Sequence, residues 1–272
     1  MSTVATQPQS APAITTAPPR PALKRPGVLA RTMAILKREL GGYFVTPVAY
    51  VFIVVYLFTM GIFTFQLGNF FENGQADLRA FFAFHPWLYL FLIPAIGMRL
   101  WAEERRQGTI ELLMTLPIPL GAVVAGKFLA AWAFAGIALA MTFPMWITVN
   151  YLGDPDNGVI MAAYVGSFLM AGGMLAISSF VSATTKNQVI AFVISVLVCF
   201  GFTISGYAPV IDVVRGLGAP QTIIDAVASF SFLTHFEAIS KGVIDLRDLV
   251  YFGTLIALCL FGTAAVVEMK KA

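Results

Sequence analysis

The amino-acid sequence predicts an all-α polytopic membrane protein with six transmembrane helices. Of its 272 residues, 58% are hydrophobic and only 11% are charged, whereas soluble domains carry about 25% charged residues. A stretch of about 20 apolar residues crosses the hydrocarbon core of a bilayer. Charge-free stretches of this length occupy residues 40–71, 80–98, 128–153, 157–185, 187–211 and 249–267. Together these observations argue against a water-soluble enzyme and against a disordered chain.

The distribution of basic residues predicts that both termini are cytoplasmic. The six spans are expected near 45–68, 80–98, 122–150, 159–182, 188–207 and 249–267, so the hydrophilic segments alternate between two sides. Thirteen of the seventeen Lys and Arg residues then fall on the side of the termini, and four fall on the other. Because basic residues stay preferentially in the cytoplasm, the side of the termini is expected to be the cytoplasmic one.

Residues 1–27 form a Pro/Ala-rich segment that we expect to be a disordered cytoplasmic tail. The segment holds six of the fifteen prolines of the chain among Ala, Thr, Ser and Gln. Such a composition cannot bury enough apolar surface to offset the entropy lost on ordering. Residues 28–272 are therefore expected to form the membrane domain.

Residues 28–40 predict an amphipathic helix that lies in the cytoplasmic membrane interface. Leu29, Met33, Leu36 and Leu40 step by four, three and four residues and form one apolar stripe. A basic amphipathic helix directly before a span is typical of the interface, and Gly41–Gly42 would permit the turn into the membrane. The alternative is that this segment is only the solvated start of the first span. The residues expected at the membrane interface are Arg31, Lys37, Arg38 and Tyr43.

The segment 99–120, between the second and third expected spans, predicts a protein contact. Residues 99–107 are expected to form a helix that leaves the membrane, and Gly108 is expected to end it before the helix resumes at Thr109. The second piece carries Leu112 and Leu113 beside charged residues, and exposed apolar residues rimmed by charge indicate a docking surface. The alternative is a solvated face whose leucines lie against lipid.

Two further patterns concern packing and the other side of the membrane. Small residues recur every four positions on two expected spans and would let helix backbones approach closely; they are Ala122, Gly126 and Ala130, and Ala163, Ser167 and Ala171. Residues 208–248 carry apolar residues at helical spacings, interrupted by Gly and Pro. They predict short amphipathic or re-entrant helices on the outer side before the sixth span, with a small folded cap as the alternative.

No catalytic or metal site is predicted, and no cofactor is expected. Residues 121–128 match the phosphate-binding pattern G-x-x-x-x-G-K, but Phe128 replaces the Ser or Thr that would bind Mg²⁺. We therefore interpret Lys127 as a snorkelling anchor. His85 is interpreted as an interfacial histidine, and His235 lies in no metal-binding motif. The net charge of +3 gives no argument for nucleic-acid binding.

The expected spans carry no Asp, Glu, Lys or Arg near their middle. Such residues usually mark ion or proton pathways. Their absence argues against an ion-coupled transporter and against a channel with a charged ring. The energy for any transport would then come from outside this chain.

Several motifs together resemble the permease subunit of ABC-2 type transporters. They are residues 37–40 (KREL), 43–47 (YFVTP), 103–113 (EERRQGTIELL) and 116–118 (LPI). Within that group the chain is most similar to the gliding-motility-associated ABC transporter permeases, through residues 231–236 (SFLTHF) and 241–252 (KGVIDLRDLVYF). The resemblance covers roughly residues 28–270.

The resemblance implies a division of labour between subunits. Such permeases pair with a separate ATP-binding subunit, normally as two permeases and two ATPases, so the chain itself is not expected to be an enzyme. Residues 28–40 would be the elbow helix, and residues 104–113 would be the coupling helix that docks in a cleft of the ATPase. The implied coupling residues are Glu103, Glu104, Arg105, Gly108, Thr109, Glu111, Leu112 and Leu113.

We therefore expect a permease subunit of an ATP-binding cassette exporter in a prokaryotic inner membrane. Its expected partners are two ABC-type ATPase subunits, a second copy of the permease or a paralogous permease, the lipid bilayer, and an extracytoplasmic accessory protein. The alternative is a membrane scaffold subunit of a motility or surface-assembly complex that moves no solute. A membrane enzyme acting on a lipid is disfavoured, because the sequence offers no nucleophile–base pair. The sequence does not name the transported substrate.

Overall fold

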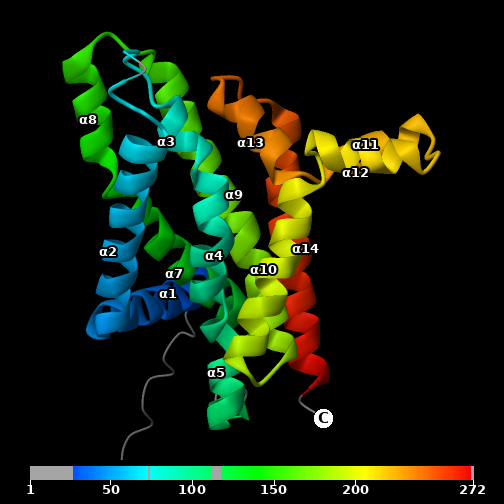
Figure 1. Ribbon diagram of the computed structural model, residues 1–272. Coiled ribbons are helices and arrows are strands. Elements are labelled where there is room, and N and C mark those ends of the chain that lie inside the picture. The colour runs from blue at the N-terminus through cyan, green and yellow to red at the C-terminus, as the bar shows by residue number, and fades with distance from the viewer. Residues whose placement is uncertain (1–26, 73, 112–117, 271–272) are drawn as a thin grey trace, which may run out of the picture.

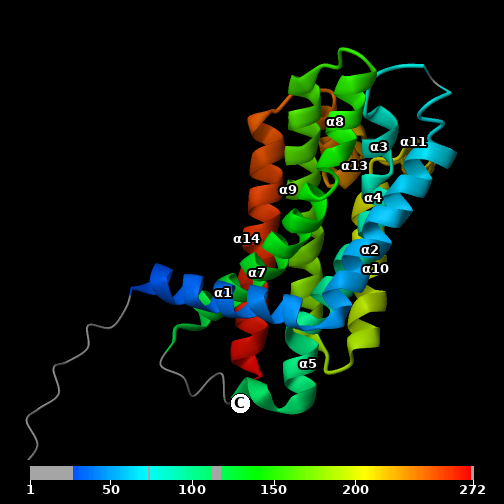
Figure 2. The same cartoon turned by 90° about the vertical axis from the view of Figure 1, so that its left-hand side faces the viewer.

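The computed structural model describes residues 27–72, 74–111 and 118–270. Over these residues the fold is a helical bundle without β-strands, crossed near one end by a transverse helix (Figures 1 and 2). The predicted all-α class is therefore confirmed for the described part of the chain. The predicted tail lies outside the described residues except for Gly27.

The helices follow one another along the chain with short connections. The first half comprises α1 (Val28–Val45), α2 (Pro47–Ile62), the π-helix η1 (Phe63–Leu67), α3 (Arg79–Ala83), α4 (His85–Gly97) and α5 (Arg99–Gln107). The second half comprises α7 (Leu120–Ala140), α8 (Phe143–Leu152), α9 (Asn157–Thr184), α10 (Gln188–Ile204), α11 (Ala208–Gly216), α12 (Gln221–Ser229), α13 (Phe232–Ser240) and α14 (Leu246–Met269).

Between four and six of these elements are candidate membrane spans. Four are long and apolar enough on their own: α2 with η1, α7 with α8, α9, and α14. Two more arise only if bent pairs count as spans, namely α10 with α11, bent by 80°, and α12 with α13, bent by 67°. The predicted second span corresponds to α3 and α4; the 13 residues of α4 extend about 20 Å, less than the hydrocarbon core of about 30 Å. The chain is thus a multi-pass membrane protein, while six spans stay a prediction.

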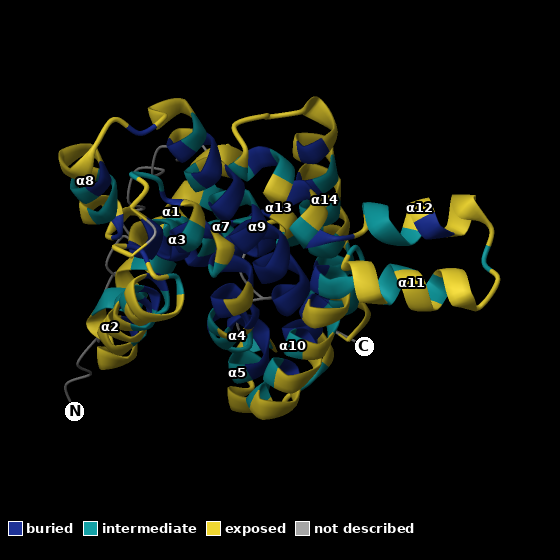
Figure 3. Cartoon of the chain, turned by 45° about the horizontal axis from the view of Figure 1, so that its top comes forward, coloured by how far each residue is buried: buried dark blue, intermediate teal, exposed yellow. Residues whose placement is uncertain are grey.

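Helix α9 forms the centre of the bundle (Figure 3). Most of its length is buried, whereas α2 and α14 remain largely exposed, as expected of helices that face lipid. Its small residues let neighbours approach: a Cβ at Gly166 would lie 2.8 Å from Ile239 of α13, and one at Gly172 would lie 2.7 Å from Trp132 of α7. The predicted stripe of Ala163, Ser167 and Ala171 is buried, so close packing of this span is confirmed.

Helix α1 lies across the bundle instead of along it (Figure 2). It does not end at Gly41–Gly42, as the sequence predicted, but continues to Val45. The chain turns at Thr46, whose backbone is extended (φ −98°, ψ 138°), because the residue before a proline is disfavoured in the helical region and Pro47 has no N–H to continue the helix. The predicted stripe is divided: Leu29 and Met33 are exposed, on a surface that a bilayer interface would cover.

The contact between α1 and α7 depends on a glycine. A Cβ at Gly126 would lie 2.7 Å from Cγ2 of Ile35 and 3.1 Å from the carbonyl oxygen of Thr32. The small-residue stripe of α7 therefore accommodates the transverse helix α1.

Gly126→Val is expected to push α1 away from α7 and to lower the free energy of unfolding by about 1–3 kcal/mol, as at other overpacked sites. Unfolding of the purified chain in mixed micelles measures this loss. Gly121→Val on the same helix is the matched control, because nothing lies within 4 Å of a Cβ built there. Adding Ile35→Ala should recover part of the loss. Equal stability of the two valine variants would contradict this account of the contact.

The short helices predicted for residues 208–248 are present as α11, α12 and α13. Helices α11 and α12 form a hairpin that projects sideways from the bundle (Figures 1 and 3). Gly218 lies in the turn between them with φ +78°, a conformation that favours glycine. Helix α13 instead packs against α9, with Phe236 and Ile239 buried.

Candidate functional site

The predicted coupling segment leaves the bundle through α5 and changes direction at Gly108. This residue has φ +71°, and its N–H donates to the carbonyl oxygen of Glu104 to close the end of α5. Residues 109–111 are helical again. The predicted helix break at Gly108 is therefore confirmed, while Leu112 and Leu113 lie outside the described residues.

The start of α5 is bound to α9 by two serines. The Ser182 hydroxyl accepts hydrogen bonds from the backbone N–H groups of Trp101 (3.1 Å) and Ala102 (3.0 Å) and donates one to the carbonyl oxygen of Met98 (2.8 Å). The indole N–H of Trp101 donates to Ser179 (3.1 Å). These bonds satisfy backbone groups at the junction between α4 and α5, so the direction of α5 is set by α9.

Two basic residues bind carbonyl groups at the C-terminal end of α9. The Arg105 guanidinium donates to the carbonyl oxygen of Ala183 (2.6 Å), and the Lys270 ammonium donates to that of Thr184 (2.5 Å). Cations are favourable at a helix C-terminus, where carbonyl groups lack helical partners. Desolvation and the nearby charges of Arg105 and Lys186 lower the pKa of Lys270. Positive charge is thus concentrated at this end of α9.

Lys127 connects its own helix, α7, with α5 and α1. Its ammonium lies 2.6 Å from Oε1 of Glu104 on α5 and 3.4 Å from Oε2 of Glu39 on α1, and 5.7 Å from the centre of the Trp101 ring. Only 4% of the residue is exposed. Its interpretation as a snorkelling anchor is therefore wrong, because two carboxylates reach the ammonium inside the protein. We call Lys127, Glu39, Glu104 and Trp101 the Lys127 cluster.

The charges of the Lys127 cluster depend on one another. Desolvation opposes ionisation of Glu39, but the charges of Lys127 and Arg38 outweigh it and lower the pKa of Glu39 below 4.5. On Glu104, Oε2 is buried without a hydrogen-bond partner in the described part of the chain. Two carboxylates therefore share one buried ammonium, and the loss of Lys127 would leave both without it.

The structure divides the described coupling residues of the prediction into three groups. Glu104 and Arg105 point toward the bundle and hold α5 in place. Glu103 pairs within α5 with Arg99 (3.2 Å) and Arg106 (3.9 Å). The exposed residues at the tip, which remain accessible to another protein, are Gly108, Thr109 and Glu111.

The predicted interface residues also include both exposed side chains and side chains that pack into the bundle. Lys37 and Arg38 are exposed, as contact with headgroups requires, and Arg38 also pairs with Glu39 (2.7 Å). Tyr43 instead packs into the bundle, with its ring stacked on Phe134 at a centroid distance of 5.0 Å. The remaining interface residue, Arg31, is only partly exposed.

His85 lies in a buried polar chain and not at an interface. It is fully buried; its Nδ1 lies 3.1 Å from the carbonyl oxygen of Phe81 and its Nε2 lies 3.3 Å from the Tyr56 hydroxyl. The Tyr56 hydroxyl also lies 3.4 Å from the Tyr89 hydroxyl, which accepts a hydrogen bond from the Ser167 hydroxyl of α9 (2.9 Å). The interfacial interpretation is therefore wrong, because α2 and α9 supply polar partners that the local sequence does not reveal.

A buried pair of ionisable residues on α13 and α14 was not predicted at all. His235 of α13 and Asp248 of α14 are 4% and 5% exposed, and Nδ1 of the ring lies 2.6 Å from Oδ1 of the carboxylate. The other ring nitrogen lies 3.0 Å from the carbonyl oxygen of Ser229. Since a neutral imidazole has one N–H, both acceptors are satisfied only if the pair holds two protons, one at each nitrogen or one shared with Asp248.

The described residues contain no group of three or more His, Cys, Asp or Glu side chains that could hold a metal ion. What they do contain is a bundle of apolar helices and an accessible segment fixed to three of them. This combination defines a multi-pass helical membrane protein with an accessible segment anchored in its bundle.

Comparison with known proteins identifies the family. Residues 33–267 match the model of the ABC-2 family transporter protein, so the chain belongs to this family and is the membrane subunit of an ABC transporter. Membrane subunits of this family are not themselves catalytic. The narrower resemblance to gliding-motility-associated permeases stays a prediction.

Two curated relatives match part of the chain. It is 31% identical to heme exporter protein B of Rhodobacter capsulatus over 130 residues, which is 45% of this chain and 55% of that protein. It is 34% identical to heme exporter protein B of Paracoccus denitrificans over 65 residues, 24% of this chain and 30% of that protein. The chain thus spans about half the length of the first relative and under a third of the second.

Proposed function

We propose that this chain is the permease subunit of an ATP-binding cassette exporter, driven by ATP hydrolysis on two separate ATPase subunits and assembled with a second permease. Both termini lie in the cytoplasm and the protein resides in the inner membrane. The excess of basic residues in the segments on the side of the termini supports this orientation. The name that both matched relatives carry, heme exporter protein B, supports export and makes heme the first compound to test.

One observation carries this proposal: residues 99–111, which comprise α5 and the turn after it, are joined to three helices of the bundle. Ser179 and Ser182 bind it to α9, and Lys127 binds it to α7 and, through Glu39, to α1. A displacement applied at the exposed tip would therefore move several helices together, because packed and hydrogen-bonded elements transmit strain instead of deforming continuously. A loop attached only by its two ends would not do this.

Glu111→Lys is expected to weaken binding of the ATPase about tenfold, the effect of about 1.4 kcal/mol at an interface, and to reduce the stimulation of ATP hydrolysis by the permease. The residue is exposed and forms no ion pair with a described residue, so the fold should not change. Co-purification from mild detergent, followed by titration of the ATPase against the permease in nanodiscs, measures both effects.

Glu268→Lys is the matched control, because Glu268 is an exposed carboxylate near the end of α14 on the same side of the bundle. Equal ATPase binding by the two lysine variants would place the contact elsewhere. Recovery of the wild-type chain without any ATPase, in preparations that still perform transport, would overturn the proposed function itself. ATPase activity that responds to no candidate substrate would favour the scaffold alternative.

A further inference from the structure

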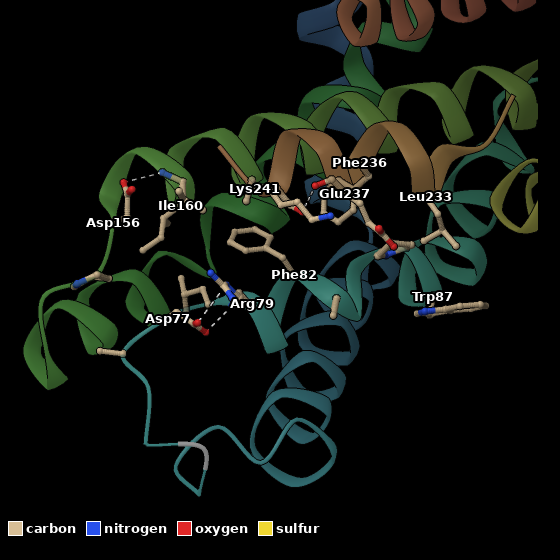
Figure 4. Close-up of a pocket in the computed structure, with 18 of the residues that line it drawn as sticks. Asp77, Arg79, Phe82, Trp87, Asp156, Ile160, Leu233, Phe236, Glu237 and Lys241 are labelled. Atoms are coloured by element: carbon tan, nitrogen blue, oxygen red, sulfur yellow. Dashed lines mark hydrogen bonds and ion pairs between the residues drawn. The ribbon is translucent and has the colours of Figure 1, made fainter. Parts of the chain in front are cut away.

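A cavity of about 870 Å³ opens at the end of the bundle opposite the Lys127 cluster. It lies between the segment 76–87, which includes α3 and the start of α4, the beginning of α9, and α13 (Figure 4). Sites for small molecules usually have volumes of about 300–1,000 Å³. The cavity is therefore large enough for a ligand, and no part of the proposed coupling mechanism uses it.

The cavity lies at the level where the hydrocarbon core of a bilayer ends. The exposed charges of α1 and the Lys127 cluster mark one boundary of the core, since charged groups are costly inside it, and Trp101 of that cluster bonds to Ser179 of α9. Ile160, in the cavity wall, lies nineteen residues before Ser179 on α9. At 1.5 Å per residue this is about 28 Å, close to the core thickness of about 30 Å.

Both apolar and charged side chains line the cavity. The apolar lining residues are Phe82, Trp87, Ile160, Leu233 and Phe236. The rim carries two cations, Arg79 and Lys241, and four carboxylates, Asp77, Asp154, Asp156 and Glu237. A cavity that offers both apolar and charged side chains suits an amphiphile of the membrane itself.

Some of the rim charges already have partners. Asp77 pairs with Arg79 (3.4 Å), and the Asp156 carboxylate accepts the backbone N–H groups of Gly158 and Val159 at the start of α9. Lys241 and Glu237, both on the α13 side of the cavity (Figure 4), form no ion pair with any residue of the described ranges. The rim thus carries one cation, Lys241, and one carboxylate, Glu237, four residues apart in the chain and without an ion-pair partner among the described residues.

We propose that this cavity binds a zwitterionic phospholipid of the phosphatidylethanolamine type from the leaflet opposite the Lys127 cluster. The lipid phosphate pairs with Lys241, the ammonium group pairs with Glu237, and an acyl chain occupies the apolar part between Phe82 and Phe236. A headgroup of net negative charge is disfavoured, because four carboxylates face it against two cations. The proposal does not rest on transport, since binding requires no ATPase.

The test uses the full chain in phosphatidylglycerol vesicles that contain a photoactivatable phosphatidylethanolamine. Labelling is expected within residues 76–87 and 233–241 and should be displaced by unlabelled phosphatidylethanolamine but not by added phosphatidylglycerol. Lys241→Glu and Glu237→Lys should each reduce labelling about tenfold, because each variant places a like charge against one charged group of the lipid headgroup. Arg247→Glu, the same charge change at an exposed residue of this end outside the cavity, should leave labelling unchanged.

A double variant and a competitor without acyl chains test whether the charged pair and the acyl chains are both needed for binding. The double exchange Glu237→Lys with Lys241→Glu keeps both charges on the rim and should restore labelling toward the wild-type amount. Glycerophosphoethanolamine, which has the headgroup without acyl chains, should not compete. Equal competition by phosphatidylglycerol, effective competition by the headgroup alone, or unchanged labelling in both single variants would overturn the proposal.

Discussion

Lys127→Met is expected to lower the free energy of unfolding by about 3–5 kcal/mol, the cost of removing one partner from a buried ion pair. Methionine preserves the length and much of the volume of the lysine side chain, so the loss reports the charge. In the variant, Glu104 and Glu39 lose the ammonium that now lies 2.6 Å and 3.4 Å away, and Oε2 of Glu104 is already buried without a hydrogen-bond partner in the described part of the chain. Since these carboxylates lie on α5 and α1, the proposed coupling segment should also detach from the bundle, and the proposed stimulation of the ATPase should fall with stability.

Unfolding in mixed micelles and ATPase stimulation in nanodiscs measure the two effects. Lys37→Met is the matched control, because Lys37 is an exposed lysine on α1. Combining Lys127→Met with Glu39→Gln and Glu104→Gln should recover much of the stability, because no uncompensated charge then remains. A Lys127→Met protein as stable as the Lys37→Met protein would contradict the role given to the cluster.

The dependence of the free energy of unfolding on acidic pH gives a second measurement on the Lys127→Met variant. The pKa of Glu39 is lowered below 4.5 in the folded protein, so its contribution to stability is complete above the unfolded value and is lost as the pH falls through the folded value. This stability should therefore decrease as the pH falls below 4.5. The decrease should be smaller in Lys127→Met, because one of the two charges that lower the pKa of Glu39, that of Lys127, is gone and only that of Arg38 remains.

Features set by local chemistry were predictable from the sequence. The helix break at Gly108 was predicted because glycine readily adopts a positive φ, and the structure places Gly108 at φ +71°. The turn after α1 was misplaced for a reason that is also local. Gly41 and Gly42 permit a turn but do not require one, whereas Pro47 prevents the helix from continuing. The proline was the stronger signal.

The partners of buried polar residues could not be predicted in this way. Lys127 is 88 residues from Glu39 in the chain, and nothing in the sequence around it reveals that two carboxylates lie beside it. Read alone, a lysine near the end of an apolar stretch is typical of a snorkelling anchor. His85 was misinterpreted for the same reason, since its partner Tyr56 lies on another helix. The positions of these residues were predictable from hydropathy, but their pairing depends on how the helices pack.

Asp248→Asn is the second change with a large expected effect, a loss of about 3–5 kcal/mol in the free energy of unfolding. Asparagine has the shape of aspartate but carries no charge, and it places an amide N–H₂ where Asp248 now has a buried oxygen without a hydrogen-bond partner in the described part of the chain. The pair joins α13 to the first turn of α14. The loss should therefore free α13, which covers α9 and forms one wall of the phospholipid cavity.

Unfolding in mixed micelles measures the loss, and Asp245→Asn is the matched control, because Asp245 is an exposed carboxylate directly before α14 that asparagine can replace as a helix cap. Replacing both partners, His235→Phe with Asp248→Leu, should lower the stability less than Asp248→Asn alone, because no buried ionisable group then lacks its partner. The phenylalanine also keeps a ring that can stack on Tyr251, whose ring centre lies 4.0 Å from that of His235. If the double variant were instead the least stable of the three, the pair would stabilise the fold by its attraction and not merely by avoiding an unpaired buried charge. If Asp248→Asn were as stable as Asp245→Asn, the charge of this pair would have no structural role.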